Sequence, residues 1–380
     1  MVANNGVGSA TQLTIVQLLP SLQDGGVERG TLEVAQALVE RGHRSMVVSA
    51  GGRMVEQLHA EGSEHVNWSI GKKSLLTLRF IWKLRRLFRK RRVDVVHARS
   101  RLPAWIAWFA LQGIPKKNRP HFVTTVHGLY SVGRYSAVMT KGERVIAVSE
   151  TVKRYIKTNY PSVDVNRVRV IPRGVDLEMF PYDFTPSESW LQQWCDDFPQ
   201  LDGKLVLTLP GRLTRLKGHH DFIDLIRCLK RKAIAVHGLI VGGEDPRRQA
   251  YAEELREKVV QRGLQEDVTF TGHRSDVREI YAISDAVFSL STKPESFGRT
   301  TLEALSLGVP VFGYDHGGVG EILGRVYPQG RVVVGGVDDL CRLLANLRDG
   351  SLKRPSRHNY TLAHMLALTL ALYEELAARP

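Results

Sequence analysis

The chain has 380 residues, of which 43% are hydrophobic and 24% are charged. This composition is that of an ordinary globular protein, and the length favours two domains over a single core. No stretch reaches the roughly 18 consecutive apolar residues of a membrane-spanning helix, and residues 1–20 lack the basic start of a secretory signal. The formal net charge of +14 is concentrated in residues 1–180, which hold 28 Lys and Arg against 13 Asp and Glu.

The first half of the chain alternates β-branched runs with helical patterns. This alternation predicts βαβ units and a parallel sheet. Helices are expected at 28–41, closed by Gly42, and at 150–158. Strands are expected at 13–18, 45–49, 93–97, 122–126, 145–148 and 168–172.

Residues 71–92 contain ten basic residues and no acidic one. Five apolar side chains of this segment recur at helical spacing, namely Leu76, Phe80, Leu84, Leu87 and Phe88. The pattern predicts a basic amphipathic helix that packs on its own sheet. Its charged face is expected to meet an anionic membrane surface or a phosphorylated acceptor. Nucleic acid is the competing partner, and it is disfavoured because no recognised binding motif is present.

The second half repeats the alternation with a nearly balanced charge, 25 Lys and Arg against 26 Asp and Glu in residues 181–380. A polar, proline-punctuated stretch at 180–199 fits a linker with a short capping helix. A helix with a broad apolar face is expected at 361–376. Strands are expected at 205–209, 235–241, 268–271, 286–290, 309–312 and 331–334.

Two glutamates mark the most informative segment, residues 291–323. Glu295 and Glu303 lie eight residues apart around Phe297 and Gly298, at a predicted strand-to-helix junction. Ligands of open parallel sheets bind at this edge, because helix N-termini and free backbone N–H groups point there. The segment therefore predicts a binding site in the second half.

Two other loops could bind an anion. Gly25 and Gly26 follow the first strand and would let the backbone approach a phosphate, although a tight turn without a ligand fits equally well. Arg212 and Lys217 lie five residues apart in a loop that opens a helix. Two cations with helix N–H groups can hold a diphosphate without a metal, and two solvated surface charges are the alternative. Neither G-x-G-x-x-G nor a Walker lysine motif is present, which argues against dinucleotide oxidoreductases and P-loop ATPases.

Histidines follow two further predicted strands. His127 comes after the strand at 122–126, where a lone histidine is more often structural than catalytic. His273 and Arg274 come after the strand at 268–271 and form a plausible rim for a nucleobase. Each signal is weak by itself.

The cysteines and clustered carboxylates indicate no metal site. Cys195, Cys228 and Cys341 are odd in number and far apart, so they fit neither a disulfide framework nor a metal cluster. This usage favours a reducing cytosol. Asp196 and Asp197 fit a solvated turn in the linker better than a metal-binding pair.

Taken in order, these motifs resemble glycosyltransferase family 4. The motifs are GGVER near the start, GRL-x-x-LKG at mid-chain, a TGH turn, PESFG-x4-EALSLGVPV and a later GG-x-x-E, and RGH and VIPRGVD also match. The likeness covers nearly the whole chain and implies the α/β GT-B architecture, with two Rossmann-like doubly wound parallel-sheet domains facing a central cleft. The expected parts are an acceptor-binding domain at 1–177, a nucleotide-sugar-binding domain at 178–357, and a C-terminal helix at 358–380 that crosses back to the first domain.

The same resemblance implies roles for the residues of the second domain. Arg212 and Lys217 would bind the diphosphate of the donor. Glu303 would bind the ribose hydroxyls, and Glu295 would contact the hydroxyls of the donor sugar. The backbone of Phe297 and Gly298 would serve sugar and phosphate, and that of His273 and Arg274 would hold the base.

In the first domain, Gly25 and Gly26 would reach the phosphate and His127 would sit beside the transferred sugar. His127, Glu295, Arg212 and Lys217 are thus the expected catalytic residues. The resemblance further implies retention of anomeric configuration without a metal or other cofactor. We expect Glu295 to form hydrogen bonds rather than act as a covalent nucleophile, with the acceptor hydroxyl losing its proton to a donor phosphate oxygen.

Two positions depart from the family pattern. Arg173 stands where Asn is usual, and Arg299 stands where an aliphatic residue is usual. Arg173 and Arg299 could extend the cationic site toward a phosphorylated acceptor. Variation at the surface without a function explains them equally well.

At a finer level, segments 97–105 and 127–139 look like those of bacterial lipopolysaccharide core transferases. The expected reaction is transfer from a nucleotide sugar, with a UDP-sugar favoured, to an anionic or membrane-anchored acceptor. The enzyme would be cytoplasmic and peripheral at the inner face of the cytoplasmic membrane, held through residues 71–92. Capsule or exopolysaccharide assembly, a glycolipid mannosyl- or glucosyltransferase, and a catalytically silent binding module are the alternatives.

Overall fold

The computed structural model divides the chain into two compact units. It describes residues 12–23, 25–244, 249–345 and 354–378. Unit 1 comprises Met1–Val148, Val152–Ile171 and Met365–Pro380, and unit 2 comprises Ser149–Thr151 and Pro172–His364. The C-terminal segment thus clusters with unit 1, and the main boundary falls after Ile171 rather than after residue 177.

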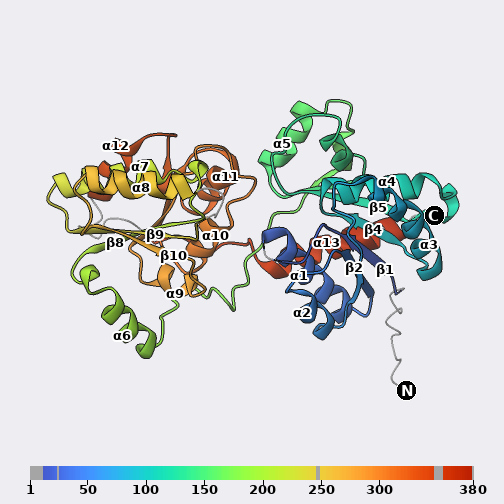
Figure 1. Ribbon diagram of the computed structural model, residues 1–380, viewed down its shortest axis with the longest axis horizontal. Helices are drawn as coiled ribbons and strands as arrows, with labels where there is room; N and C mark the ends of the chain where they lie inside the picture. The colour runs from blue at the N-terminus through green and yellow to red at the C-terminus, as the bar shows by residue number, and fades with distance from the viewer. Residues whose placement is uncertain (1–11, 24, 245–248, 346–353, 379–380) are drawn as a thin grey trace, which may run out of the picture. The chain divides into compact units, whose positions relative to one another are not determined.

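Unit 1 is built on a seven-stranded sheet in which each neighbouring pair is parallel, in the order β3-β2-β1-β4-β5-β6-β7 (Figure 1). Its strands are β1 Thr14–Leu18, β2 Arg44–Ser49, β3 Glu64–Asn67, β4 Val95–Ala98, β5 His121–Val126, β6 Arg144–Ala147 and β7 Val168–Val170. All of β1 is buried, as expected of a central parallel strand covered on both faces. The sequence did not predict β3, because its residues are mostly polar and it pairs only with β2 at the edge.

All helices of unit 1 except the C-terminal one connect these strands. The helices are α1 Gly26–Glu40, α2 Val55–Ala60, α3 Arg79–Arg91, α4 Arg101–Gln112, α5 Glu150–Asn159 and the C-terminal α13 Leu362–Ala377. A buried polar contact fixes α13 on this sheet, since the Tyr373 hydroxyl lies 2.6 Å from Nδ1 of His97 at β4. His97 also contacts the hydroxyl of Thr125 on β5 at 2.6 Å through its other ring nitrogen.

The basic segment 71–92 is only partly the helix that the sequence predicts. Phe80, Leu84 and Phe88 of α3 are buried, as expected. The prediction for Leu76 is wrong, because this residue lies in the short 3-10 helix η1 (Leu75–Leu78) and is 71% exposed. The hydroxyl of Ser74 accepts the backbone N–H of Leu76 at 3.3 Å and starts this separate turn, which places Leu76 out of phase with α3.

Unit 2 contains a six-stranded parallel sheet in the order β10-β9-β8-β11-β12-β13. Its strands are β8 Leu205–Pro210, β9 Val236–Val241, β10 Val268–Gly272, β11 Ala286–Ser289, β12 Val311–Tyr314 and β13 Arg331–Val332. In both sheets the third, second, first and fourth strands along the chain are consecutive neighbours, which is the Rossmann order. The expectation of two Rossmann-like parallel-sheet domains is therefore confirmed.

Helices cover both faces of the second sheet. They are α6 Glu188–Asp197, α7 His219–Arg231, α8 Gln249–Gln261, α9 Val277–Ala282, α10 Arg299–Ser306, α11 Gly317–Val326 and α12 Val337–Ala345. In Figure 1, α7, α8 and α12 lie on one face and α9 on the other. The capping helix expected within 180–199 is α6, whose Trp194 packs against Leu201 and Val206.

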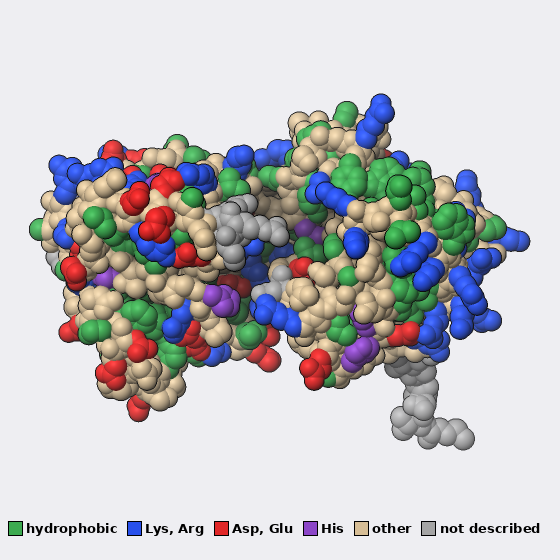
Figure 2. Space-filling view, viewed as in Figure 1, with side chains coloured by type: hydrophobic (Ala, Val, Ile, Leu, Met, Phe, Trp, Pro, Cys, Tyr) green, Lys and Arg blue, Asp and Glu red, His purple; other side chains and the backbone are tan. Residues whose placement is uncertain are grey.

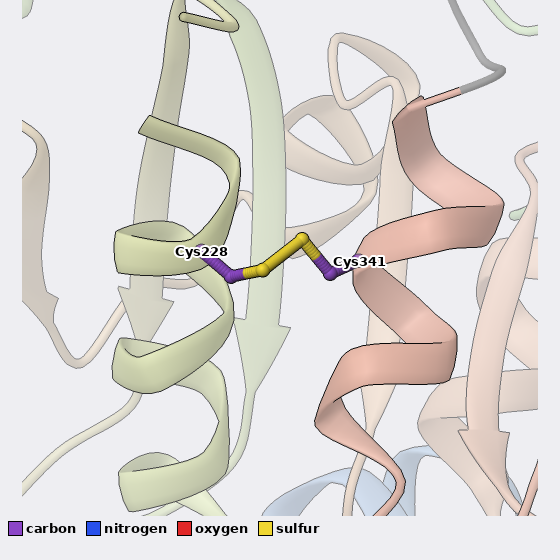
Figure 3. Close-up of a disulfide and its surroundings, with 2 residues drawn as sticks. All are labelled: Cys228 and Cys341. Atoms are coloured by element: carbon purple, nitrogen blue, oxygen red, sulfur yellow. A yellow bond between two sulfur atoms is a disulfide. The ribbon is translucent and has the colours of Figure 1, made fainter. Parts of the chain in front are cut away.

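A disulfide joins Cys228 of α7 to Cys341 of α12 (Figure 3). The prediction that the cysteines form no disulfide is therefore wrong. The two residues are 113 positions apart in the chain, but their helices pack together on one face of the sheet with the Cα atoms 6.3 Å apart. Cys195 is exposed and unbridged. The cysteines thus no longer support a reducing compartment.

None of the helices within the described ranges combines the length and apolar character needed to cross a bilayer.

Candidate functional site

The switch point of the unit 2 sheet lies between β8 and β11, which are adjacent in the sheet but not along the chain. At such a point the loops leaving two neighbouring parallel strands turn to opposite faces and leave room for a ligand outside the carboxyl ends. The loop after β8 is 211–218, and the loop after β11 is 290–298. These loops carry five predicted site residues, namely Arg212, Lys217, Glu295, Phe297 and Gly298.

Gly218 lets the two loops pack directly against each other. It ends the loop after β8 with φ +74°, a left-handed conformation that glycine adopts readily, and it immediately precedes α7. A Cβ at this position would lie 2.1 Å from the carbonyl oxygen of Leu290, at the end of β11. The close approach brings Lys217 to the loop that contains Glu295.

Lys217 and Glu295 form an ion pair, with 2.6 Å between Nζ and Oε1. Their side chains are 30% and 22% exposed, so the pair is accessible from solvent. The hydroxyl of Ser291 donates a second hydrogen bond to the same carboxylate. Lys217, which would bind phosphate, therefore contacts Glu295, which would bind sugar hydroxyls. This contact suits a ligand in which a sugar is joined to a phosphate.

The charge of Glu295 is stabilised by its neighbours. Burial alone would raise its pKa, but Lys217, the Ser291 hydroxyl and His316 together hold the pKa of Glu295 below its usual value. The carboxylate is therefore ionised near neutral pH and accepts hydrogen bonds.

Two glycines at the start of α11, which follows the neighbouring strand β12, pack closely against the loop that contains Glu295. A Cβ on Gly317 would lie 2.6 Å from the carbonyl oxygen of Glu295, and one on Gly318 would lie 2.3 Å from Cα of Phe297. The backbone N–H of Gly318 donates to the Glu295 carbonyl at 2.8 Å. Only a residue without a side chain fits either position, which explains the GG pair of the sequence.

The helices that begin next to the switch point are α7, α10 and α11, which follow β8, β11 and β12. Gly298 precedes the first residue of α10 with φ +100°, and Phe297 beside it is 6% exposed. Helix N-termini present unpaired N–H groups and a partial positive charge. The edge is suited to a diphosphate.

Glu303 lies one turn into α10 and is 9% exposed. Nε of Arg299 donates to Oε1 of Glu303 at 3.0 Å. Arg299, which departs from the family pattern, therefore contacts the glutamate expected to bind ribose. Arg299 therefore lies beside Glu303, and the roles of both residues stay predictions.

The TGH turn lies at the end of β10, which includes Thr271 and Gly272 and is two strands away from β8 in the sheet. Nε and Nη2 of Arg274 contact the two carboxylate oxygens of Asp276 at 2.8 and 2.6 Å, so its side chain shapes the turn. Cβ of His273 lies close to Gly243, which follows β9. The backbone role of the turn in holding a base stays a prediction.

The remaining candidates are distributed between the units. Arg212 is an exposed residue of the loop after β8 in unit 2. In unit 1, Gly25 has φ +147° and precedes α1, whose first residue is Gly26. His127 follows β5, and its backbone N–H donates to the Tyr130 hydroxyl at 3.3 Å. All three unit 1 candidates thus lie at the carboxyl edge of their own sheet, and their roles stay predictions.

Sequence reasoning missed two residues that orient Glu295. Ser291 donates to its carboxylate, and a ring nitrogen of His316 lies 2.6 Å from the carbonyl oxygen of Ser291. Both were open to prediction from position, because Ser291 follows β11 closely and His316 immediately precedes the GG pair. Across the described residues, three or more His, Cys, Asp or Glu side chains nowhere gather in a way that could hold a metal ion.

Two protein-family models match the chain. The one described as Glycosyltransferase Family 4 matches residues 24–179, and the one described as Glycosyl transferases group 1 matches residues 195–361. The first match falls mainly on unit 1 and the second on unit 2.

Curated relatives cover different parts of the chain. Mannosylfructose-phosphate synthase of Agrobacterium fabrum (strain C58 / ATCC 33970) is 36% identical over 40% of this chain and 33% of its own length. A phosphatidylinositol N-acetylglucosaminyltransferase protein of Homo sapiens is 27% identical over 93% of this chain and 74% of its length. Lipopolysaccharide core biosynthesis mannosyltransferase LpsB of Rhizobium meliloti (strain 1021) is 27% identical over 54% of this chain and 60% of its length. The chain thus matches between a third and three quarters of these relatives.

Solved structures share the fold over nearly all of the chain. A glycosyltransferase from Rickettsia africae ESF-5 is 29% identical with a TM-score of 0.84, covering 97% of this chain and 100% of that one. Anabaena Alr3699/HepE in complex with UDP-glucose is 20% identical with a TM-score of 0.74, covering 97% and 98%. The first half of the chain thus matches the Glycosyltransferase Family 4 model, the second half matches the Glycosyl transferases group 1 model, and the fold is shared with solved glycosyltransferases.

Proposed function

We propose that the protein is a retaining, metal-independent glycosyltransferase that moves a hexosyl unit from a nucleoside-diphosphate sugar to a phosphorylated or lipid-anchored glycan. The contact between Lys217 and Glu295 at the switch point of unit 2 carries this proposal. A phosphate on Lys217 and a sugar hydroxyl on Glu295 would place the scissile sugar–phosphate bond between them.

Departure of the diphosphate defines the chemistry that the site must assist. Breaking the bond builds negative charge on the leaving group and leaves an oxocarbenium-like sugar. Arg212, Lys217 and the N-terminus of α7 would stabilise the leaving group, and a preorganised donor of this kind is typically worth about 3 kcal/mol of barrier. Glu295 would orient the sugar, and the acceptor hydroxyl would pass its proton to a phosphate oxygen of the donor.

The preferred donor is a UDP-sugar, and the structure of Anabaena HepE with UDP-glucose supports that preference through a shared fold. Thermal denaturation with UDP-, GDP- and ADP-sugars tests it, because a ligand that binds only the folded state raises the melting temperature. We expect UDP-sugars to give the largest rise, with no change on adding magnesium or EDTA. A strict magnesium requirement would contradict the proposal.

A catalytically silent binding module is the non-enzymatic alternative. Hydrolysis of the donor by the purified protein separates the two, since a silent module would bind the nucleotide sugar without releasing the nucleoside diphosphate.

The acceptor that we propose is the lipopolysaccharide core, at the inner face of the cytoplasmic membrane. The likeness to LpsB supports this choice, and the ten basic residues of segment 71–92 suit a phosphorylated acceptor at an anionic membrane surface. A glycolipid acceptor is the second candidate, because the relative that matches 93% of this chain is named for phosphatidylinositol. Transfer assays with a phosphorylated and a dephosphorylated core oligosaccharide test the first choice, and equal rates would exclude a phosphate-dependent acceptor.

A further inference from the structure

Unit 1 exposes a cluster of large hydrophobic side chains around η1. Leu75 is 86% exposed, Leu76 71% and Leu78 45%, and Trp82 at the start of α3 is 63% exposed. Single exposed leucines are common on protein surfaces, but several within eight residues form a patch that needs an explanation. None of these residues belongs to the candidate transfer site.

The cluster borders an open groove of about 630 Å³ between η1 and α4. Leu75 and Leu78 form one wall, and Leu102 and Ile106 of α4 form another. The lining is completed by Lys73, Ser74, Thr77 and Tyr135. The volume lies within the roughly 300–1,000 Å³ range of small-molecule sites. Its walls are mainly aliphatic, which suits an apolar ligand.

Aromatic side chains extend this surface along α4. The rings of Trp105 and Phe109 stack with centroids 5.4 Å apart, and Trp108 packs edge-on against both. Nε1 of Trp105 donates to the carbonyl oxygen of Tyr135 at the groove. Tryptophan and tyrosine with an apolar body and a polar tip are the side chains that accumulate at membrane–water interfaces.

One cation, Lys73, lines the groove, and further cations follow along the segment that contains it. Exposed basic residues of segment 71–92 are Lys72, Lys73, Arg79, Lys83, Arg86, Arg89, Lys90, Arg91 and Arg92. Arg85 is used structurally, since it donates to the carbonyl oxygens of Ala110 and Phe109 and so ties α3 to α4. Figure 2 shows green hydrophobic side chains beside blue Lys and Arg side chains over the part of unit 1 where Figure 1 places α3 and α4.

We propose that this groove is a lipid-binding site that takes one acyl chain of an anionic lipid, while the cations of segment 71–92 hold its phosphate. The aliphatic walls account for the acyl chain, the adjacent cations account for the charge, and the exposed leucines would enter the membrane surface beside it. The site adds a chain-binding pocket to the electrostatic membrane contact, and it rests on the proposed approach of unit 1 to a membrane.

Vesicle binding by two matched variants tests the site. We compare Leu75→Asp/Leu78→Asp with Val260→Asp/Val333→Asp, which adds the same charge at exposed valines of unit 2. On vesicles of phosphatidylglycerol with phosphatidylcholine, we expect the leucine variant to partition at least about tenfold less well than the unaltered protein, and the valine variant to match it. Circular dichroism and melting curves confirm that both variants fold. Equal binding by the two variants would overturn the proposal.

The position of the acyl chain is tested with phosphatidylglycerol that carries a photoactivatable group on that chain. Adducts within residues 73–78, 102–106 or at Tyr135 are the expected result. Adducts elsewhere, or vesicle binding without adducts at the groove, would show a purely electrostatic surface contact and overturn the acyl-chain site. Binding of a single-stranded oligonucleotide in place of vesicles would likewise overturn it and identify a nucleic-acid surface.

Donor hydrolysis without vesicles separates this inference from the proposed function. We expect the leucine variant to hydrolyse the donor as well as the unaltered protein does. If hydrolysis fails in every protein while vesicle binding follows the prediction, the transferase proposal fails and the lipid site stands. If the proteins hydrolyse the donor but vesicle binding does not follow the prediction, the lipid site fails and the transferase proposal stands.

Discussion

Lys217 contributes a positive charge at the centre of the candidate site. It neutralises Glu295 and lies at the N-terminus of α7, where a bound diphosphate would gain from both the ammonium group and the helix. Lys217, predicted to bind phosphate, and Glu295, predicted to bind sugar hydroxyls, are 78 residues apart in the chain but in direct contact in the fold.

Lys217→Ala should lower kcat/KM by about 100-fold or more, the usual effect of removing one preorganised donor from a developing anion. Steady-state kinetics with the UDP-sugar measure the change. Lys232→Ala, at an exposed lysine just after α7, is the control and should leave the rate unchanged. Similar rates for both variants would show that Lys217 does not touch the leaving group.

Glu295→Ala tests the role of the carboxylate. We expect weaker donor binding and a lower rate without any covalent adduct, because Glu295 is proposed to hold sugar hydroxyls. Mass spectrometry of the unaltered protein mixed with donor should likewise find no glycosylated Glu295. A trapped sugar on this residue would favour a double-displacement reaction.

His219 makes the stability of unit 2 depend on pH. Burial lowers the pKa of His219 to about 4, and the residue is fully buried at the start of α7. The unfolded chain binds a proton near pH 6.5 and the folded chain does not, so stability falls as the pH drops from 6.5 toward 4. Between pH 7 and pH 5 the protonation of His219 alone should lower the free energy of unfolding by about 2 kcal/mol.

Urea unfolding of the unaltered protein and of His219→Phe at pH 7 and pH 5 measures this cost. The unaltered protein should lose about 2 kcal/mol more than the variant over that range. His364→Phe, at an exposed position, should behave as the unaltered protein does. Equal losses in all three proteins would mean that His219 titrates normally in the folded state.

At the scale of elements, the site depends on loops that approach each other closely. The loop after β8 meets the end of β11 at Gly218, and the start of α11 meets the Glu295 loop at Gly317 and Gly318. These glycines act on the backbone, so their effect on Lys217 and Glu295 is indirect. A side chain at Gly218, Gly317 or Gly318 would displace the backbone of the loop after β11.

Gly218→Ala should destabilise unit 2 by about 2 kcal/mol or more, because it adds a left-handed backbone strain to a clash with the Leu290 carbonyl. Gly203→Ala is a matched control, since Gly203 has φ +65° but no atom within 4 Å of an added Cβ. Gly203→Ala should lower the free energy of unfolding by only about 1 kcal/mol. Urea unfolding gives both values, and equal losses would show that the contact with Leu290 relaxes freely.

At the scale of the whole molecule, both units have a Rossmann-order sheet, but the covalent cross-link is found in unit 2. The disulfide between Cys228 and Cys341 spans 113 residues of chain and ties α12 to α7, the helix that begins just after Lys217. A link across so long a loop restricts the unfolded chain strongly.

Cys228→Ser/Cys341→Ser should lower the free energy of unfolding of unit 2 by roughly 2–4 kcal/mol. Dithiothreitol should have the same effect on the unaltered protein and none on the double variant. Cys195→Ser serves as the control, since Cys195 takes no part in the link. If the unaltered protein and the double variant have the same free energy of unfolding, and dithiothreitol changes neither, the two thiols are free.

The sequence by itself determined the alternation of strands and helices, the two-domain organisation and the residue types at the sheet edge, because these depend on local periodicity and on short motifs such as the Glu295–Glu303 pair. It placed β12 two residues early, since the apolar run begins at Val309 while the backbone N–H of Val309 still closes α10 on Ala304. It also missed the polar edge strand β3, where apolar alternation is absent.

Only the tertiary structure decided which distant residues meet. The pairing of Lys217 with Glu295, the support of Glu295 by Ser291 and His316, the link from Cys228 to Cys341, and the groove between η1 and α4 all follow from the packing of parallel strands and their helices. Contacts between residues tens of positions apart depend on strand order and loop path, and local patterning does not encode either.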